Sequence, residues 1–103
     1  MRIIPGPLAF DWDKGNIDKN FERHNVKDRE AEELFLKKFL YIFEDKKHSA
    51  KEKRYGVFGQ TNKGRRLSVV FTIREGKIRI ITVRDMSRRE RRSYEKIKIN
   101  AKV

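Results

Sequence analysis

The chain has no cysteine, only two prolines and only two histidines among its 103 residues. The lack of cysteine excludes disulfides, thiol catalysis and cysteine-based zinc sites, and it fits a reducing compartment such as the cytoplasm. No apolar run approaches about 18 residues, so the sequence predicts no membrane span. The charged N-terminal segment, interrupted by proline, does not resemble a cleavable signal. We therefore expect a soluble cytoplasmic protein.

Motifs of several enzyme classes are also missing. Gly56 and Gly59 fall inside a strand pattern and lack the Gly-Lys-Ser/Thr ending of a phosphate-binding loop. No Gly-x-Ser-x-Gly sequence is present, so a hydrolase nucleophile elbow has no support. The two histidines, His24 and His48, lie far apart in the sequence, and we predict neither a metal site nor a cofactor.

The chain is long enough for one small domain, which we place at residues 1–103. Apolar residues make up 37% of the sequence and charged residues 41%, so the core must be modest and the surface densely ionic. Seven Phe, three Tyr and one Trp provide large rings for the chain to fold around, which argues against disorder.

Positive charge is concentrated in the second part of the chain, and the formal net charge is +12. Residues 1–45 carry eight basic and ten acidic side chains, whereas residues 46–103 carry nineteen basic and five acidic ones. Such a surface is typical of proteins that bind a polyanion, and nucleic acid is the commonest polyanion. A charged surface that only keeps the protein soluble is the simpler alternative.

Two helices are predicted after a short apolar segment at 8–12, which would form a strand or an extended arm. The first helix covers 14–24, where Ile17, Phe21 and His24 fall on one side. A histidine on such a stripe is either a packed structural residue or a catalytic one.

The second helix is predicted over 28–39, with Asp28 as its N-cap. Ala31, Leu34 and Phe35 recur at the spacing of a buried helix face. Four β-prone segments follow, at 40–43, 54–59, 66–74 and 77–84.

The C-terminal part contains clear turn and cap signals. Glu75-Gly76 predicts a tight turn between the last two strands. Ser87 and Glu90 have the spacing of a capping box for a helix over 88–96, and residues 98–103 are expected to be a tail. The element order predicts an α+β domain with two N-terminal helices, a four-stranded antiparallel sheet and a C-terminal basic helix.

RNA cleavage is a reaction that needs none of the missing motifs. It requires activation of a ribose 2′-hydroxyl, stabilisation of a dianionic phosphorane and protonation of a leaving oxygen. Arg and Lys supply the electrostatic part without a metal, and His, Glu, Lys or Tyr supply the proton transfers. The densest group of such residues lies at 46–54 and includes His48, Lys51 and Arg54. A solvated loop is the alternative interpretation of this segment.

Arg84 ends the last strand, on the face that alternation gives to Ile78 and Ile80. There it would lie near the basic helix and contact a phosphate, or it would simply extend its guanidinium into solvent. One side of that helix carries Arg88, Arg91, Arg92 and Glu95. This side is either a surface for phosphates or an acidic partner, or a solvated face.

Three groups of residues share an order and spacing with a known family. The first is Phe10-Asp11-Trp12-Asp13, followed by Asn20 and His24-Asn25-Val26. The second is Asp45-Lys46-Lys47-His48-Ser49, then Glu52-Lys53-Arg54-Tyr55 and Gly59. The third is Val69-Val70-Phe71-Thr72, Arg79-Ile80-Ile81, Arg84 and Ser87-Arg88-Arg89-Glu90-Arg91-Arg92-Ser93-Tyr94-Glu95. Together, over about residues 10–95, they resemble the BrnT toxins of bacterial type II toxin–antitoxin modules.

Four positions depart from that pattern. Asn16 stands where the family usually has Lys, and Asn25 replaces a Gly. Lys47 replaces the usual Arg, and Asp85 occupies a position where a basic or small residue is common.

The resemblance implies a RelE-like α+β fold and a ribonuclease that shuts down translation by cutting mRNA without a metal. It also implies a BrnA-like antitoxin, a toxin–antitoxin hetero-oligomer, and contact with operator DNA only through the antitoxin. The implied catalytic residues are His24, Lys51, Arg54 and Arg84, with His48, Arg88 and Arg89 on the substrate side. Arg54 and Arg84 would hold the scissile phosphate, and one of the histidines would move a proton.

Two other functions remain open from the sequence. A non-catalytic basic module would bind RNA or DNA without cutting it. An inactive toxin would act only in antitoxin binding and co-repression, an alternative that the unusual Asn16 and Asp85 keep open.

Overall fold

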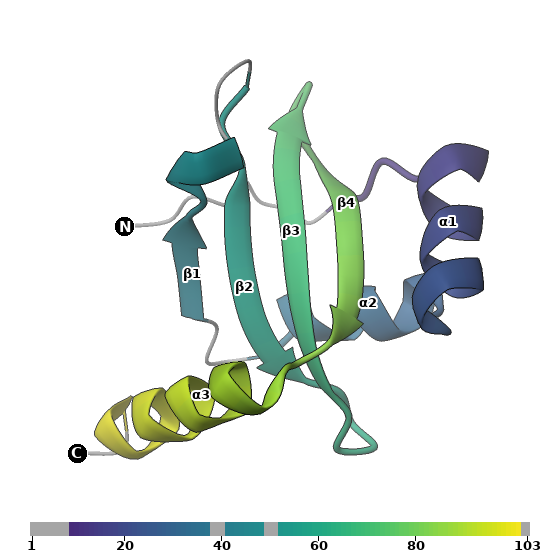
Figure 1. The fold of residues 1–103 in the computed structure, drawn as a ribbon. Helices are drawn as coiled ribbons and strands as arrows, with labels where there is room; N and C mark the ends of the chain where they lie inside the picture. Colours follow the sequence, from purple (N-terminus) through teal and green to yellow (C-terminus); the bar gives the residue numbers. More distant parts are fainter. Residues whose placement is uncertain (1–8, 38–40, 49–51, 102–103) are drawn as a thin grey trace.

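The computed structural model describes residues 9–37, 41–48 and 52–101. Within them, three α-helices and a four-stranded antiparallel sheet of order β1-β2-β3-β4 confirm the predicted α+β class. The elements are α1 (Lys14–His24), α2 (Asp28–Phe35), β1 (Tyr41–Glu44), a 3-10 turn η1 (Lys46–His48), β2 (Tyr55–Gln60), β3 (Arg66–Arg74), β4 (Lys77–Asp85) and α3 (Arg88–Ala101). Figure 1 shows α2 behind the sheet, α1 beside β4, and α3 across one end of the strands.

The sheet packs one face against α2 to form the core. Alternate residues of β3, namely Leu67, Val69 and Phe71, are fully buried there. Leu34 of α2 approaches β2 so closely that a Cβ on Gly59 would lie 2.6 Å from its Cγ. The glycine therefore allows the helix to rest directly on the strand. The other buried apolar residues of this cluster are Val26, Ala31, Phe35, Val57, Ile78, Ile80 and Val83.

The β3–β4 hairpin agrees with the sequence prediction. β3 has the predicted ends, β2 begins and ends one residue later than predicted, and β1 and β4 each end one residue later. The predicted start of β1, residue 40, lies outside the described residues. Glu75 and Gly76 both have left-handed φ angles, 51° and 75°. Positive φ at both central positions is the geometry of a two-residue turn that matches strand twist.

β4 contains a bulge that the sequence did not reveal. Val70 pairs with Thr82, but the next residue, Phe71, pairs with Ile80. Ile81 is therefore the extra residue, opposite no residue of its own on β3.

The bulge reverses which residues of β4 face the core. Ile78 and Ile80 are buried in it, and after the bulge the buried residue is Val83. The prediction that Arg84 shares a face with Ile78 and Ile80 is wrong for this reason. Arg84 pairs with Ser68 on the opposite side of the sheet.

α1 has the predicted ends but not the predicted buried face. Its buried residues are Asn16 and Asn20, whereas Phe21 is 48% exposed. Asn16 Nδ2 donates to the carbonyl of Ile80 (3.0 Å), and Asn20 Oδ1 accepts from the backbone N–H of Val83 (3.0 Å). α1 is therefore attached to the edge of β4 by amide hydrogen bonds, and the apolar-stripe prediction is wrong because those bonds satisfy buried backbone groups.

α2 begins at Asp28, as predicted, but ends earlier, and its N-cap is not the predicted Asp28. Lys27 is the N-cap. Its side chain makes no cap hydrogen bond, and its backbone N–H donates to Glu30 Oε1 (3.1 Å). The helix ends at Phe35, where the bond from Leu36 N–H to the Glu33 carbonyl tightens the last turn. Leu36 is 71% exposed, so no core contact extends the helix. The rest of the predicted span, 38–39, lies outside the described residues.

The two ends of the described chain are also ordered by pairing and capping. Phe10 forms a parallel bridge with Ile78 of β4, which confirms the predicted extended arm. Ser87 and Glu90 form the predicted capping box of α3. α3 continues to Ala101, so the prediction of a tail from 98 is wrong for residues 98–101. Among the described residues, no helix has the length and apolar character needed to cross a bilayer.

Candidate nucleic-acid interface

The sheet has a second face that is turned away from α2, called here the open face. The described residues along its middle are Tyr41, Phe43, Gly56, Phe58, Ser68, Val70, Thr72, Thr82 and Arg84. α3 lies over one end of it, where Arg66 pairs with Glu95 (2.9 Å) and Ser68 Oγ donates to Glu90 (3.4 Å). α1 borders it along β4 (Figure 1). The open face is therefore a floor of small and apolar residues between two helices.

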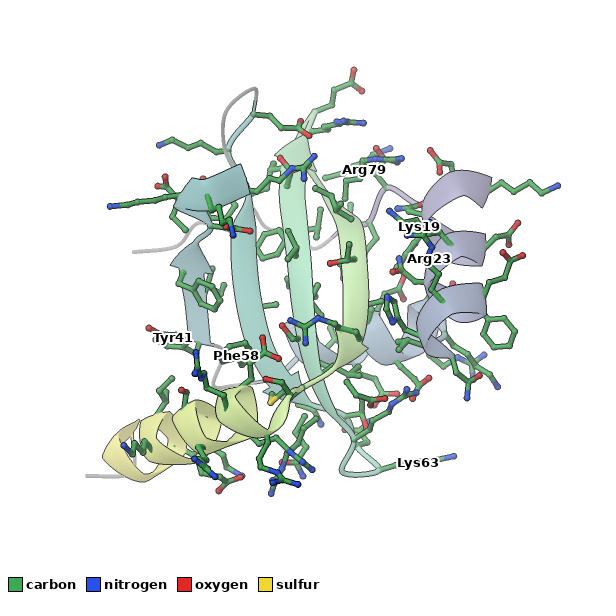
Figure 2. All side chains as sticks on the ribbon, viewed as in Figure 1. Lys19, Arg23, Tyr41, Phe58, Lys63 and Arg79 are labelled. Atoms are coloured by element: carbon green, nitrogen blue, oxygen red, sulfur yellow. The ribbon has the colours of Figure 1, made fainter. Side chains whose placement is uncertain are left out.

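At the end of the open face opposite to α3, cationic side chains surround a pocket of about 210 Å³, called here the basic pocket. Lys19 of α1, Arg74 of β3 and Arg79 of β4 line it together with Arg54 and one carboxylate, Glu52. Figure 2 shows Lys19, Arg23 and Arg79 along the same side of the molecule, where α1 meets β4. Four cations around one opening are suited to an anion such as a phosphate.

Carboxylates hold two of these arginines in position. Arg79 contacts Asp13 (2.9 Å) and Asp11 (3.5 Å), and Arg74 contacts Glu52 (3.3 Å). Hydrogen bonds from the Asn16 backbone and from Arg79 keep the pKa of the Asp13 carboxyl below its ordinary value. Arg79 is only 19% exposed, so its guanidinium is fixed at the pocket wall before any ligand arrives.

Arg84 lies at the other end of the open face and is bound to α3. Its Nη1 and Nη2 donate to Glu90 Oε1 and Oε2 at 2.6 and 2.9 Å. The guanidinium lowers the pKa of Glu90 to about 2, and Glu90 raises the pKa of Arg84. A carboxylate with so low a pKa is a poor proton acceptor near neutral pH, so Glu90 is suited to positioning rather than to base catalysis.

His24 ends α1 near the same end of β4. Its carbonyl accepts a hydrogen bond from Arg65 Nη2 (3.1 Å), and Arg65 also binds Asp85 (2.7 Å) and Glu30 (3.2 Å). The pKa of Asp85 is lowered, mainly by the hydrogen bond from Arg65 and also by the charge of His24. His24 is half-buried.

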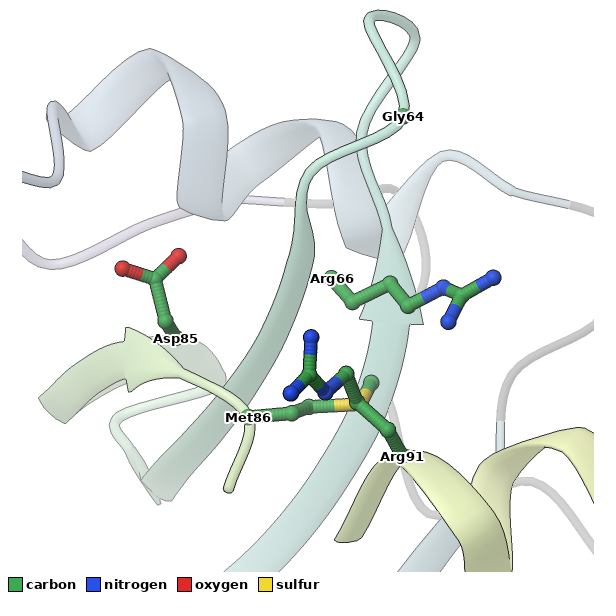
Figure 3. A pocket seen from close by; sticks show the side chains of 5 residues that line it. All are labelled: Gly64, Arg66, Asp85, Met86 and Arg91. Carbon is green, nitrogen blue, oxygen red and sulfur yellow. The ribbon is translucent and has the colours of Figure 1, made fainter. Parts of the chain in front are cut away.

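Most cations of α3 gather on one surface, called here the α3 surface, around a hollow of about 440 Å³. It is lined by Arg66, Arg88, Arg91, Arg92, Glu95 and Lys96. This confirms that Arg88, Arg91 and Arg92 share one side, although Glu95 forms its ion pair with Arg66 of β3. A neighbouring pocket of about 320 Å³ is lined by Arg66, Asp85 and Arg91. Figure 3 shows Arg66 of β3 and Arg91 of α3 at this pocket, with the Arg66 guanidinium directed away from Asp85.

Those predicted site residues that the structure describes do not gather at one point. Arg54 lies one residue before Tyr55, the partner of Phe71, whereas Arg84 pairs with Ser68. Measured along β3, the position beside Arg54 and the position beside Arg84 are four residues apart, or about 13 Å. Arg84 and His24 lie at one end, with Arg88 on the α3 surface beyond it, and the exposed Arg89 is not among the residues of that hollow. His48 ends η1, and Lys51 lies outside the described residues.

Sequence reasoning missed Lys19, Arg74 and Arg79 as members of a site. A signal for the two arginines was available, because Arg79 pairs with Thr72 two positions before Arg74 in the predicted hairpin. Even-numbered residues of β3 face away from the core, so both cations belong to the open side. No sequence signal placed Lys19, because the buried side of α1 was assigned incorrectly.

Two of the departures from the family pattern have structural roles here. Asn16 accepts from the backbone N–H of Asp13 (2.7 Å) and, through Nδ2, binds Ile80 of β4. Asp85 anchors Arg65. Asn16 also lines the basic pocket, as an uncharged residue among its cations.

The comparison with known proteins identifies the family. A family model described as ribonuclease toxin, BrnT, of type II toxin-antitoxin system matches residues 12–90, which contain α1, α2, the whole sheet and the start of α3. A comparison with curated proteins gives no significant match. The match covers most of the chain, including the basic pocket and the Arg84–Glu90 pair, and the chain belongs to the BrnT family of ribonuclease toxins.

Proposed function

We propose that this chain is a metal-independent endoribonuclease that cuts mRNA and thereby stops translation. Membership of the BrnT family supports the ribonuclease and toxin parts of the proposal. The observation that carries the rest is the basic pocket, in which Lys19, Arg54, Arg74 and Arg79 surround one opening on the open face.

The cations of the basic pocket suit the charge that develops during RNA cleavage. In that reaction the 2′-oxygen forms a bond to phosphorus, the bond to the 5′-oxygen breaks, and a 2′,3′-cyclic phosphate and a 5′-hydroxyl result. The phosphorane between them carries two negative charges, which fixed guanidinium and ammonium groups stabilise. Arg54 and Arg79 are the residues that we assign to this role, and the held position of Arg79 favours it.

Proton transfer and the rest of the RNA strand involve the other predicted residues. One group must accept the proton of the 2′-hydroxyl and one must donate a proton to the 5′-oxygen. We assign these tasks to His48 and Lys51, which precede Arg54 in the sequence. His24 lies with Arg84 at the other end of β4, so we assign it, like Arg84, to the RNA beyond the scissile phosphate. Because Arg84 lies about 13 Å from the level of Arg54 along the strands, we assign it to a neighbouring phosphate of the same RNA, with Arg88 and Arg89 beyond it.

In the proposed reaction, side chains rather than a metal ion stabilise the negative charge of the phosphorane. Among residues 9–37, 41–48 and 52–101, no three His, Asp or Glu side chains are grouped as metal ligands would be. The arginines around the basic pocket are the available alternative source of positive charge.

The proposal also includes a BrnA-like antitoxin that forms a hetero-oligomer with this chain and contacts operator DNA on behalf of both. The family is one of type II modules, in which the antitoxin is a protein. The cationic α3 surface suits an acidic partner as well as RNA.

The test is induced expression of the chain and of an Arg54→Ala, Arg84→Ala double variant, with growth and total RNA followed in both. Lys63→Ala, on the exposed turn between β2 and β3 (Figure 2), is the matched control for loss of positive charge. We expect arrest and RNA decay with the wild type and the control only. The purified protein should cut RNA in a chelator and leave 2′,3′-cyclic ends. Intact RNA with soluble, folded wild type would contradict the proposal.

A further inference from the structure

Three aromatic rings form a cluster on the open face, called here the aromatic platform. Tyr41 and Phe43 of β1 and Phe58 of β2 have ring centroids 5.3 to 6.5 Å apart. Tyr41 pairs directly with Phe58 across the two strands. The three rings therefore form one continuous apolar surface.

The aromatic platform is not part of the protein core. None of its rings belongs to the buried cluster or to the apolar side chains packed against it. Tyr41 is 42% exposed, so this end of the aromatic platform is open to solvent. The packing of the core therefore gives no reason for aromatic residues at these positions.

Space for the platform is provided by a glycine. Phe43 pairs with Gly56, and a Cβ there would lie 2.4 Å from Phe43 Cζ. The ring thus lies over the backbone of β2, beside Phe58. Gly56 allows this close approach, because any larger residue would displace the ring.

Cations flank the aromatic platform on the same face. Phe58 pairs with Ser68, and Ser68 pairs on its other side with Arg84, so one strand separates the ring from the guanidinium. Figure 2 shows Tyr41 and Phe58 next to α3, whose surface carries Arg88, Arg91 and Arg92. Rings beside a cationic track are the arrangement by which proteins bind single-stranded nucleic acid.

We propose that the aromatic platform stacks an unpaired base of the RNA while Arg84 and the α3 surface bind the phosphates around it. The inference rests on the proposed function and specifies its substrate as single-stranded RNA. A base is favoured over an apolar peptide side chain because the flanking charges are positive and would meet phosphates. Duplex RNA cannot present a base face to the rings.

The test uses a short single-stranded 2′-O-methyl RNA that carries one 2-aminopurine. It cannot be cut because it lacks the 2′-hydroxyl, so binding is measured independently of cleavage. We expect fluorescence quenching by the wild type, and about 5- to 150-fold weaker binding with Tyr41→Leu, Phe58→Leu. Phe21→Leu, which removes the 48% exposed ring of α1, is the matched control and should bind like the wild type. Circular dichroism and thermal unfolding check that each variant is folded.

A second measurement does not depend on the folding of a variant. Replacing the 2-aminopurine by an abasic site removes the stacking partner from the RNA side. The abasic RNA should bind the wild type more weakly by the same factor, but the platform variant should bind both RNAs equally. Equal binding of both RNAs by the wild type would overturn the inference.

Cleavage of unmodified RNA, assayed in parallel, separates the inference from the proposed function. Cleavage without quenching would overturn the inference that the aromatic platform stacks a base, but the ribonuclease proposal would stand. Quenching without cleavage would support base stacking on the platform and overturn the ribonuclease proposal. If the platform variant binds RNA normally but loses its antitoxin, the rings serve a protein partner and the inference is wrong.

Discussion

Arg84 and Glu90 form a bidentate ion pair, with Nη1–Oε1 at 2.6 Å and Nη2–Oε2 at 2.9 Å. This pair connects the end of β4 to the first turn of α3. Glu90 also accepts the backbone N–H of Ser87 (2.8 Å), so one carboxylate both caps the helix and orients the arginine. The direction in which α3 leaves the sheet, and with it the α3 surface, depends on this contact.

The first prediction concerns pH and this carboxylate. The pKa of Glu90 is about 2 in the folded protein and near 4.5 without its partners. A lowered folded pKa gives stability that is complete above the unfolded pKa and is lost as the pH falls toward about 2. Because the Arg84 side chain is 43% exposed, we expect Glu90→Gln to lose only about 1 kcal/mol of unfolding free energy at neutral pH.

Urea unfolding of both proteins at several pH values measures this contribution. The difference between wild type and Glu90→Gln should shrink as the pH falls below about 4.5. Ser87→Ala removes the hydroxyl half of the capping box but keeps the ion pair, and its effect should change less with pH. A wild-type to Glu90→Gln difference that is constant with pH would contradict the ionic explanation.

The second prediction concerns the amide contacts between α1 and β4. Asn20→Leu should reduce the unfolding free energy by about 1–3 kcal/mol, although leucine is more hydrophobic, because the buried N–H of Val83 loses its acceptor. Phe21→Leu, on the exposed side of the same helix, should change stability by less than about 0.5 kcal/mol. Chemical denaturation measures both, and a stabilising Asn20→Leu would show that the edge of β4 does not need this acceptor.

The third prediction concerns the close approach of α2 to the sheet. Gly59→Ala should destabilise the protein by about 1–3 kcal/mol, because the new Cβ would lie 2.6 Å from Leu34 Cγ and 2.9 Å from Cδ2. Leu34→Ala in the same chain removes those atoms, so the double variant should be less destabilised than the two single effects added together. Additive losses in thermal unfolding would mean that the two residues do not compete for space.

The fourth prediction concerns the basic pocket. Arg79→Gln should weaken binding of uncleavable single-stranded RNA and lower the dependence of log K on log salt by about 0.7, the value for one phosphate contact. Lys63→Gln removes one charge from the exposed turn and should leave that slope unchanged. Titrations at several salt concentrations measure both slopes. Equal slopes for Arg79→Gln and the wild type would exclude Arg79 from the RNA contacts.

Local signals predicted the parts of the fold that depend on local physics. The turn at Glu75-Gly76 needs left-handed angles, and Ser87 with Glu90 satisfies the first amides of α3, so short sequence patterns located both. The bulge at Ile81 and the buried side of α1 were not predictable in that way. They depend on each other, because Asn16 and Asn20 bind backbone groups on either side of the bulge. A pattern of apolar spacing cannot reveal amides that bury themselves against a distant strand.

The candidate site, like the fold, was predictable only where local sequence patterns determine it. The resemblance singled out Arg54 and Arg84 one by one, but the distance between them depends on strand register, which alternation alone misread at β4. Arg79 and Lys19 line the same pocket because α1 packs on β4, which the sequence did not reveal.

The attachment of α1 to β4 has a consequence for how this sheet can grow. The outer side of β4 already holds the arm at Ile78 and the two asparagines at Ile80 and Val83. A strand from another chain would therefore meet occupied backbone groups at that edge. The opposite edge is β1, which carries Tyr41 and Phe43 and pairs with β2 alone within the described part of the chain. A strand that paired with this edge would therefore lie beside the aromatic platform.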